Sequence, residues 1–422
     1  MSGQTLNDTI PYRTLFGVFA RIGLLSFGGP AAQIALLHRT LVDERRWISE
    51  AEFLSALSFC MLLPGPEAMQ LATWTGWRLR GTGGGLIAGL LFVLPGAAVV
   101  LALATLYAAF GQVPVVAALF TGVQAAVVAV VIEALLRVSR RALKIPAHKM
   151  AAVLAFVALA LFGLPFPAVI IVAGLYGYLT TKATAPTPSG PRPWAATWRA
   201  VVIWGTVWLL PLAALVLLAP SFYAEVAVFF AKLAVVTFGG AYAVLAWMTQ
   251  AIVADKHWLT LPQMMDALGL AETTPGPLIL VTQFVAYVAG HQKDGWLGGL
   301  SAALITLWMT FAPCFLWIFA ASPWLDRLTQ MPRLSGALSF ITAAVVGVIA
   351  NLSLWFATHV VFAQVGRIDL GPIHALWPQI STLRPLPTVL ALSAAYLLAR
   401  RHWPLPLVLM LSAITSAIAA WM

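Results

Sequence analysis

The sequence has little charge. Of its 422 residues only 9% are Asp, Glu, Lys or Arg, whereas 61% are hydrophobic. A soluble protein of this length needs far more charge to cover its surface. Long apolar stretches recur, many of them close to the ~20 residues that cross a bilayer as a helix. These stretches are continuous rather than alternating, which disfavours a β-barrel. The composition therefore predicts an all-α polytopic membrane protein in contact with the lipid bilayer.

Cysteine pairs and metal-ligand motifs are also lacking. Cys60 and Cys314 both lie in apolar segments, and the seven histidines are scattered. No CxxC or HExxH motif occurs, so we expect no disulfide framework, no metal site and no cofactor. Acidic residues number 14 against 24 Lys and Arg, for a net charge of +10. In so apolar a chain, this excess is typical of basic loops at the cytoplasmic membrane face, and no nucleic-acid partner is expected.

The sequence does contain an internal repeat. FARIGLLSFGG at 19–29 resembles FAKLAVVTFGG at 230–240, which lies 211 positions later. The same offset pairs Trp47 with Trp258, and it pairs the two Pro-Gly-Pro motifs. A duplicated chain follows. We predict an N-terminal transmembrane repeat over 1–181, a basic linker with one additional transmembrane helix over 182–222, and a C-terminal transmembrane repeat over 223–422.

The distribution of basic residues predicts the orientation. Loops 137–149 and 182–199 carry several Lys and Arg and almost no acid, which places them in the cytoplasm. Counting spans from there, the N-terminus is cytoplasmic and the C-terminus external. A single span near 200–219 carries the chain across between the halves. We therefore expect two inverted-topology repeats linked by this additional helix.

Each repeat begins with two apolar blocks that are interrupted in the middle. The arms are too short to cross a bilayer alone, and both a re-entrant hairpin and a kinked span fit their length. The predicted helix breaks are Pro64, Pro66, Pro275 and Pro277, together with the Gly-Gly pairs. A helix that restarts after such a break presents free N–H groups and a positive dipole end, which favour an anion.

The breaks therefore predict an anion site between the repeats. Ser26 and Thr237 occupy equivalent positions and can donate hydroxyl hydrogen bonds. Arg21 and Lys232 are equivalent cations within apolar runs, which predicts a buried pair near the anion. The predicted substrate-binding residues are Arg21, Ser26, Gly28, Gly29, Gly65, Lys232, Thr237, Gly239, Gly240 and Gly276.

Carboxyl groups next to the breaks are candidates for proton coupling. Glu67 directly follows the first Pro-Gly-Pro, and Glu272 precedes the second by three residues. A carboxylate beside an anion site has a reason to take up a proton when the anion arrives. Stabilisation of a helix N-terminus is the alternative role for Glu67. Asp266 and Glu133 are further candidates, although Glu133 is also spaced to pair with Arg137 on one helix.

Several motifs closely resemble those of the chromate ion transporter family, in its long two-domain form. They are LSFGGP at 25–30, LVDERRWIS at 41–49, LLPGPEAMQLA at 62–72, LFVLPG at 91–96, TFGG at 237–240 and AETTPGPLILVTQFVAY at 271–287. Departures from the family pattern occur at Ser58, where many members carry Asn, and at Met69, where many carry Gln. The second Phe-Gly-Gly is followed by Ala241 rather than proline, and Asp43 has no acidic counterpart at Ala254.

The resemblance implies a bacterial cytoplasmic-membrane protein that exports chromate and confers resistance to it. Sulfate is a tetrahedral anion of the same charge, so sulfate is a further candidate substrate. The sequence leaves open whether the protein forms a homodimer. An uptake or exchange carrier for sulfate or a related oxyanion is one alternative. An anion channel is a second, because half-helices also build channel filters. The chain is not expected to be an enzyme.

Overall fold

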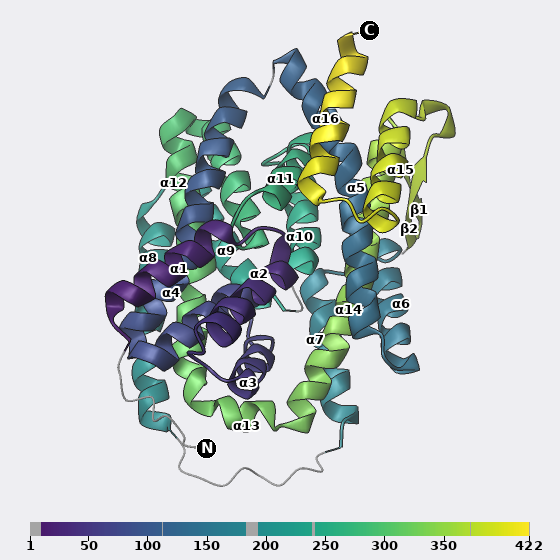
Figure 1. Cartoon of the computed structure of the whole chain (residues 1–422). Coiled ribbons are helices and arrows are strands. Elements are labelled where there is room, and N and C mark those ends of the chain that lie inside the picture. Colours follow the sequence, from purple (N-terminus) through teal and green to yellow (C-terminus); the bar gives the residue numbers. More distant parts are fainter. Residues whose placement is uncertain (1–9, 112, 183–192, 239–240, 372, 422) are drawn as a thin grey trace.

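The computed structural model describes residues 10–111, 113–182, 193–238, 241–371 and 373–421. Within these residues the chain is helical almost throughout, which confirms the all-α polytopic prediction (Figure 1). Five helical segments are long and apolar enough to cross a membrane, and they are Glu67–Phe110, Pro114–Ala142, Trp194–Leu218, Leu278–Thr329 and Pro332–Val361. The protein is thus a multi-pass membrane protein.

The first half opens with short helices and ends with longer ones. Its elements are α1 (Tyr12–Leu25), α2 (Gly29–His38), η1 (Arg39–Glu44), α3 (Glu50–Cys60), α4 (Glu67–Phe110), α5 (Pro114–Ala142), α6 (Pro146–Ala160) and α7 (Phe166–Thr180). A separate helix, α8 (Trp194–Leu218), follows where one additional span was expected. Trp208 is the one buried residue of α8, so most side chains of this helix lie at the surface of the molecule.

The second half repeats the order of the first. Its elements are α9 (Ser221–Val236), α10 (Ala241–Gln250), η2 (Ala251–Asp255), α11 (Leu261–Thr273), η3 (Leu278–Leu280), α12 (Val281–Ala321), η4 (Ser322–Trp324), α13 (Leu325–Thr329), α14 (Pro332–Val361), β1 (Val365–Leu370), β2 (Ile373–Pro378), η5 (Ile380–Thr382), α15 (Pro385–Ala399) and α16 (Leu405–Trp421). The antiparallel pair β1–β2 lies within residues 359–383, which the apolar pattern predicts as a long loop, and its turn uses Gly371 at φ 61°.

Local geometry recurs at the offset of 211 residues. The π-helical turns η1 and η2 are each followed by a residue with positive φ, Arg46 in one half and His257 in the other. The next helix is then capped by a capping box, in which Ser49 pairs with Glu52 and Thr260 with Gln263. Turn conformation and helix start are therefore encoded twice.

The two longest helices are kinked at matching places. α4 leaves helical geometry at Arg80 and Gly81, and α12 does so at Asp294 and Gly295. The apolar pattern separates a block ending near residue 78 from a span beginning near residue 86, and the structure agrees, because α4 consists of two helical arms that meet at Arg80 and Gly81. Small residues let the two arms pack closely against each other, because Gly76 and Gly84 touch across the kink with no room for a Cβ atom.

The halves exchange their last two helices. α14 packs against α6 and α7 of the first half, whereas α5 packs against α15 and α16 of the second half. α4 and α12 also pack against each other, as do α5 and α14. The largest hydrophobic core draws residues from both halves. The two repeats therefore form one body with a shared interior.

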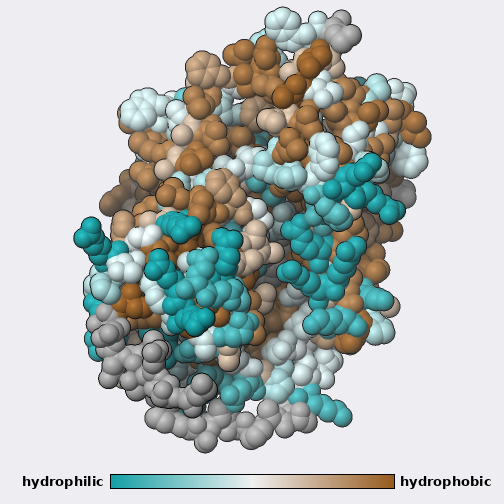
Figure 2. Space-filling view, in the orientation of Figure 1, coloured by the Kyte–Doolittle hydropathy of each residue, from teal (hydrophilic) through white to brown (hydrophobic). Residues whose placement is uncertain are grey.

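Equivalent helices end at opposite ends of the molecule. In Figure 1 the α4–α5 connection lies at the top, whereas α13, which connects α12 to α14, lies at the bottom. Figure 2 shows apolar surface over the upper part of the molecule, with hydrophilic side chains gathered over the region of α1–α3 and along one side of the long helices.

Candidate functional site

The first break contacts the last break across the interface between the halves. After α1, the chain leaves the helix at Ser26, and the Gly276 N–H donates to the Ser26 carbonyl at 2.9 Å. The same N–H lies 3.1 Å from the Ser26 hydroxyl oxygen. The buried amide of Gln33 then donates to the Gly276 carbonyl at 2.6 Å. We call this contact, formed by Ser26, Gln33 and Gly276, junction 1.

The other two breaks make the equivalent contact. The Gly65 N–H donates to the Thr237 carbonyl at 2.8 Å. Adding 211 to each number converts Ser26 into Thr237 and Gly65 into Gly276, so the exchange is reciprocal, as at an interface between two copies. Gln70 supports this contact by donating to the Pro64 carbonyl at 2.7 Å. We call the contact of Gly65, Gln70 and Thr237 junction 2.

Each Pro-Gly-Pro break also packs against the long helix of the other half. A Cβ atom at Gly96 of α4 would lie 2.2 Å from the Pro275 carbonyl oxygen. A Cβ atom at Gly65 would lie 3.1 Å from Sγ of Cys314 in α12 and 2.7 Å from the Gln70 amide nitrogen. Glycine is therefore required where α4 approaches the second break, because any side chain there would collide with backbone.

The predicted donors are engaged within the protein in this conformation. The Ser26 hydroxyl donates to the Gly23 carbonyl, and the Thr237 hydroxyl donates to the Leu233 carbonyl. The N–H groups of Gly65 and Gly276 are taken by the junctions. At Gly28 and Gly29, φ is 87° and 77°, and the space beside Gly29 is open. Of the predicted donors within the described residues, the N–H groups at the start of α2 are therefore the ones that stay accessible. Gly239 and Gly240 lie outside the described residues.

Arg21 and Lys232 lie elsewhere than expected. The prediction of a buried cation pair is wrong, because both side chains are exposed on the protein surface. Arg21 lines a cavity of about 250 Å³ between α1 and the α2–η1 segment. Three more arginines line this cavity, Arg13, Arg39 and Arg45, and Arg39 is paired with Glu44. Sequence position alone did not reveal on which face of its helix Arg21 lies.

The carboxyl groups next to the junctions face cations from α5. Glu67 is the first residue of α4, and the charge of Arg141 acts on it. Glu272 accepts a hydrogen bond from the Tyr242 hydroxyl at 2.7 Å, and the charge of Arg137 acts on it. Residues four apart lie on one helix face, so both junctions approach the same stretch of α5.

The α5 arginines were interpreted from the sequence as part of a cytoplasmic loop and a helix-end ion pair. The ion pair is present, with Arg137 2.6 Å from Glu133. The structure adds that α5 remains helical to Ala142, so Arg137 and Arg141 belong to the helix rather than to a loop. The sequence offered two signals for this arrangement, the Pro-Gly-Pro breaks and the basic run after Glu133. Neither shows that the breaks lie near α5, because that proximity depends on the packing of α5 against α11.

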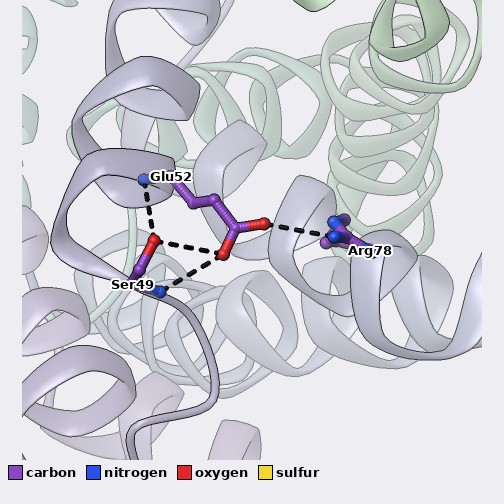
Figure 3. A network of polar contacts seen from close by, with 3 residues as sticks. All are labelled: Ser49, Glu52 and Arg78. Atoms are coloured by element: carbon purple, nitrogen blue, oxygen red, sulfur yellow. Dashed lines mark hydrogen bonds and ion pairs between the residues drawn. The ribbon is translucent and has the colours of Figure 1, made fainter. Parts of the chain in front are cut away.

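A polar network fixes the arm of α4 that leads from junction 2 to the kink. Figure 3 shows Ser49 and Glu52 capping α3, while the other carboxylate oxygen of Glu52 meets Arg78 of α4. The Arg78–Glu52 distance is 3.2 Å, and both side chains are partly exposed. This contact orients α3, and therefore the break after it, relative to the first turns of α4.

A second cavity, of about 520 Å³, lies between α10, α14 and the β1–β2 pair. Thr249, Gln250 and Asn351 are among the polar residues that line it, and Arg367 and His374 line it from the strands. Of the residues at which the chain departs from the family pattern, Met69 is buried at the start of α4, whereas Ser58 is exposed on α3.

Comparison with known proteins identifies the family. The model of the chromate transporter family matches residues 13–178 and 224–418. A chromate transport protein of Pseudomonas aeruginosa is 35% identical over 369 residues, covering 86% of this chain and 83% of that protein. A chromate transport protein of Cupriavidus metallidurans is 29% identical, over 81% of this chain and 82% of that protein. A probable chromate transport protein of Synechococcus elongatus is 30% identical, over 79% and 81%. No solved structure matches this chain. The chain therefore belongs to the chromate transporter family.

Proposed function

We propose that this protein is a secondary transporter that exports chromate across the bacterial cytoplasmic membrane and so confers chromate resistance. The relatives named above are chromate transport proteins and share most of their length with this chain. A dianion leaving a negative interior gains about 2.3 kcal/mol per charge per 100 mV, or about 4.6 kcal/mol in total. Export is therefore the direction that the membrane potential favours.

The observation that carries a transport mechanism is the reciprocal pair of junctions. Hydrogen bonds between equivalent breaks give the halves a symmetric contact about which they can rock, which is the motion of alternating access. The opposite ends at which α4 and α12 finish support an inverted arrangement, with the N-terminus cytoplasmic and the C-terminus external (Figure 1). In this proposal the junctions mark the fixed centre and the remaining surfaces open alternately.

The α5 arginines supply the positive charge in this proposal. Without substrate, Arg137 is paired with Glu133, while Glu67 and Glu272 lie within electrostatic reach of Arg141 and Arg137. An arriving dianion displaces these carboxylates from the cations, while the start of α2 at Gly28 and Gly29 contributes N–H groups. The cavity around Arg21 attracts the anion from the cytoplasm, because clustered cations raise the local anion concentration. Lys232, Gly239 and Gly240 remain proposed contributors from the second half.

Everted membrane vesicles test the direction and the site together. Vesicles with this protein should accumulate chromate when a membrane potential, interior positive, is imposed. Arg141→Gln and Arg137→Gln should lower the rate at least ten-fold. Lys149→Gln is the matched control, because Lys149 is an exposed cation at the start of α6, away from the junctions, and it should stay within two-fold of the parent. Chromate accumulation only in right-side-out vesicles would contradict export.

The alternatives have separate readouts in the same vesicles. A sulfate carrier would accumulate sulfate in preference to chromate, so each anion is measured in competition with the other. A channel would show no saturation and no counterflow of labelled chromate against unlabelled chromate. Saturable counterflow is the result expected here.

A further inference from the structure

A buried carboxyl group connects the two halves away from the junctions. Asp266 of α11 is 5% exposed. Its Oδ2 accepts a hydrogen bond from the Tyr107 hydroxyl at 2.7 Å, and its Oδ1 accepts one from the Gln124 amide at 2.8 Å. Tyr107 belongs to α4 and Gln124 to α5, so both donors come from the first half and the acceptor from the second.

Within the described residues, no cation lies beside this carboxyl group on the helices that pack against α11, and the cations of α12, His291 and Lys293, follow Phe284 by about two helix turns. Of the elements that pack against α11, η3 and α16 contain no titratable residue, and the stretches 93–110 of α4 and 114–132 of α5 contain only Tyr107. α12 contributes Phe284, which packs on the Tyr107 ring at 5.2 Å between centroids. Glu133 and Arg137 lie more than two helix turns beyond Gln124 along α5. The described ion pairs do not include Asp266.

Packing holds the three side chains in place. Phe120 of α5 meets the Tyr107 ring edge-on at 5.1 Å. Gly269, one turn after Asp266, brings α11 so close to α5 that a Cβ atom would lie 2.2 Å from Val123. A charged carboxylate is costly in such a place unless it is paired, and two neutral donors only partly compensate it. The group is thus poised between a charged form that accepts both hydrogen bonds and a neutral form that cannot accept both equally well.

We propose that Asp266 is the proton-carrying switch of the transport cycle, and that its protonation loosens the α11 contact with Tyr107 and Gln124 so that the halves can move apart. The proposal rests on the proposed transport function and assigns the coupled ion as a proton. When Asp266 is charged, both donors tie α11 to α4 and α5. When it is protonated, its own O–H takes the Tyr107 oxygen as acceptor, so Tyr107 no longer donates to a charged oxygen and the contact weakens.

Proton movement measured separately from chromate movement tests the switch. Reconstituted vesicles loaded with a pH-sensitive dye report protons, and chromate counterflow at equal pH reports binding and exchange. The parent should show chromate-driven proton movement. Asp266→Asn keeps a similar size and still forms hydrogen bonds, and it should retain counterflow within three-fold while losing proton movement at least ten-fold. Asp255→Asn, on the exposed turn η2 of the same half, is the matched control and should behave as the parent.

A second variant probes the hydrogen bond itself. Tyr107→Phe removes one donor to the charged form, so protonation becomes easier, and the midpoint of the transport pH profile should move upward by about one to two pH units. Asp266→Asn with full proton movement, or Tyr107→Phe with an unmoved midpoint, overturns the proposal. Failure of the parent itself to exchange chromate would instead reject the proposed function, so the two failures are distinguishable.

Discussion

Replacing Gln33 by methionine isolates one hydrogen bond of junction 1. Gln33 is 2% exposed, and its amide donates to the Gly276 carbonyl at 2.6 Å and to the Ser26 carbonyl at 3.3 Å. The Ser26 carbonyl keeps its bond from the Gly276 N–H, whereas the Gly276 carbonyl has no other hydrogen-bond donor among the described residues. Methionine has nearly the same length and no donor, so the variant leaves one buried carbonyl unsatisfied.

The expected cost follows from that single orphaned group. A buried unsatisfied acceptor costs about 1–3 kcal/mol. Unfolding entropy near 2.1 cal/mol/K per residue over 422 residues gives about 0.9 kcal/mol/K. The melting temperature should therefore fall by about 1–3 °C. The position equivalent to Gln33 in the second half is Val244, which is fully buried, so no second amide compensates the loss.

Thermal unfolding of the purified protein in detergent, at one fixed scan rate, measures this change. Gln330→Met is the matched control. Because Gln330 is exposed, this substitution should shift the melting temperature by less than about 0.5 °C. Chromate transport should also fall in Gln33→Met, since junction 1 is part of the proposed fixed centre. Equal melting temperatures for Gln33→Met and Gln330→Met would refute the reasoning that junction 1 depends on this amide.

Two further predictions address the close approach at α4 and the strand pair. Gly96→Ala places a Cβ atom 2.2 Å from the Pro275 carbonyl oxygen, so it should destabilise by about 1–3 kcal/mol and lower transport, whereas Gly17→Ala, with nothing within 4 Å, should do neither. Thermal unfolding and vesicle transport measure both variants, and an unaffected Gly96→Ala would contradict the assigned packing. In the strand pair, the hydrogen bond with His374 and the charge of Arg367 hold the pKa of Asp369 below its ordinary value. A lowered pKa means that the contact is fully present above the ordinary pKa of about 3.9 and is lost as the pH falls through the lower folded-state value. Asp369→Asn should therefore speed hydrogen exchange over residues 365–378 at pH 7, and the difference from the parent should shrink below about pH 4. A difference independent of pH would argue against this contact.

The sequence predicted the parts of the fold that are encoded locally and twice. The helices end before both Pro-Gly-Pro motifs and before Phe27 and Phe238, as the repeated motifs predicted. The structure adds a π-helical turn before each of the equivalent residues Trp47 and Trp258. Such features depend on residues close in sequence, so a repeat makes them visible. The separation of α4 into two arms at Arg80 and Gly81 agrees with the gap between the apolar stretches, whereas the close contact of the arms at Gly76 and Gly84 was not predicted.

The candidate site was predictable only in part. Matching offsets indicated that the breaks are related, but not that Ser26 would meet Gly276 and Thr237 would meet Gly65. Arg21 carried the expected charge on an exposed helix face, while Arg137 and Arg141 gained their importance from α5 packing beside both halves. These relations join residues that lie more than 70 positions apart, and hydrophobic periodicity carries no information about them. The strand pair formed where short apolar stretches flank Gly371, too short a signal to separate from a loop.

The exchange of terminal helices has a consequence for biogenesis. α7 ends at Thr180, but its partner α14 begins only at Pro332, so the first half leaves the ribosome long before its neighbours exist. During that interval α6 and α7 must rest in lipid without their final contacts, and α5 must wait still longer for α15 and α16. Maturation of the N-terminal repeat therefore depends on synthesis of nearly the whole chain. Two separately expressed halves should each be short-lived and should stabilise one another when produced together.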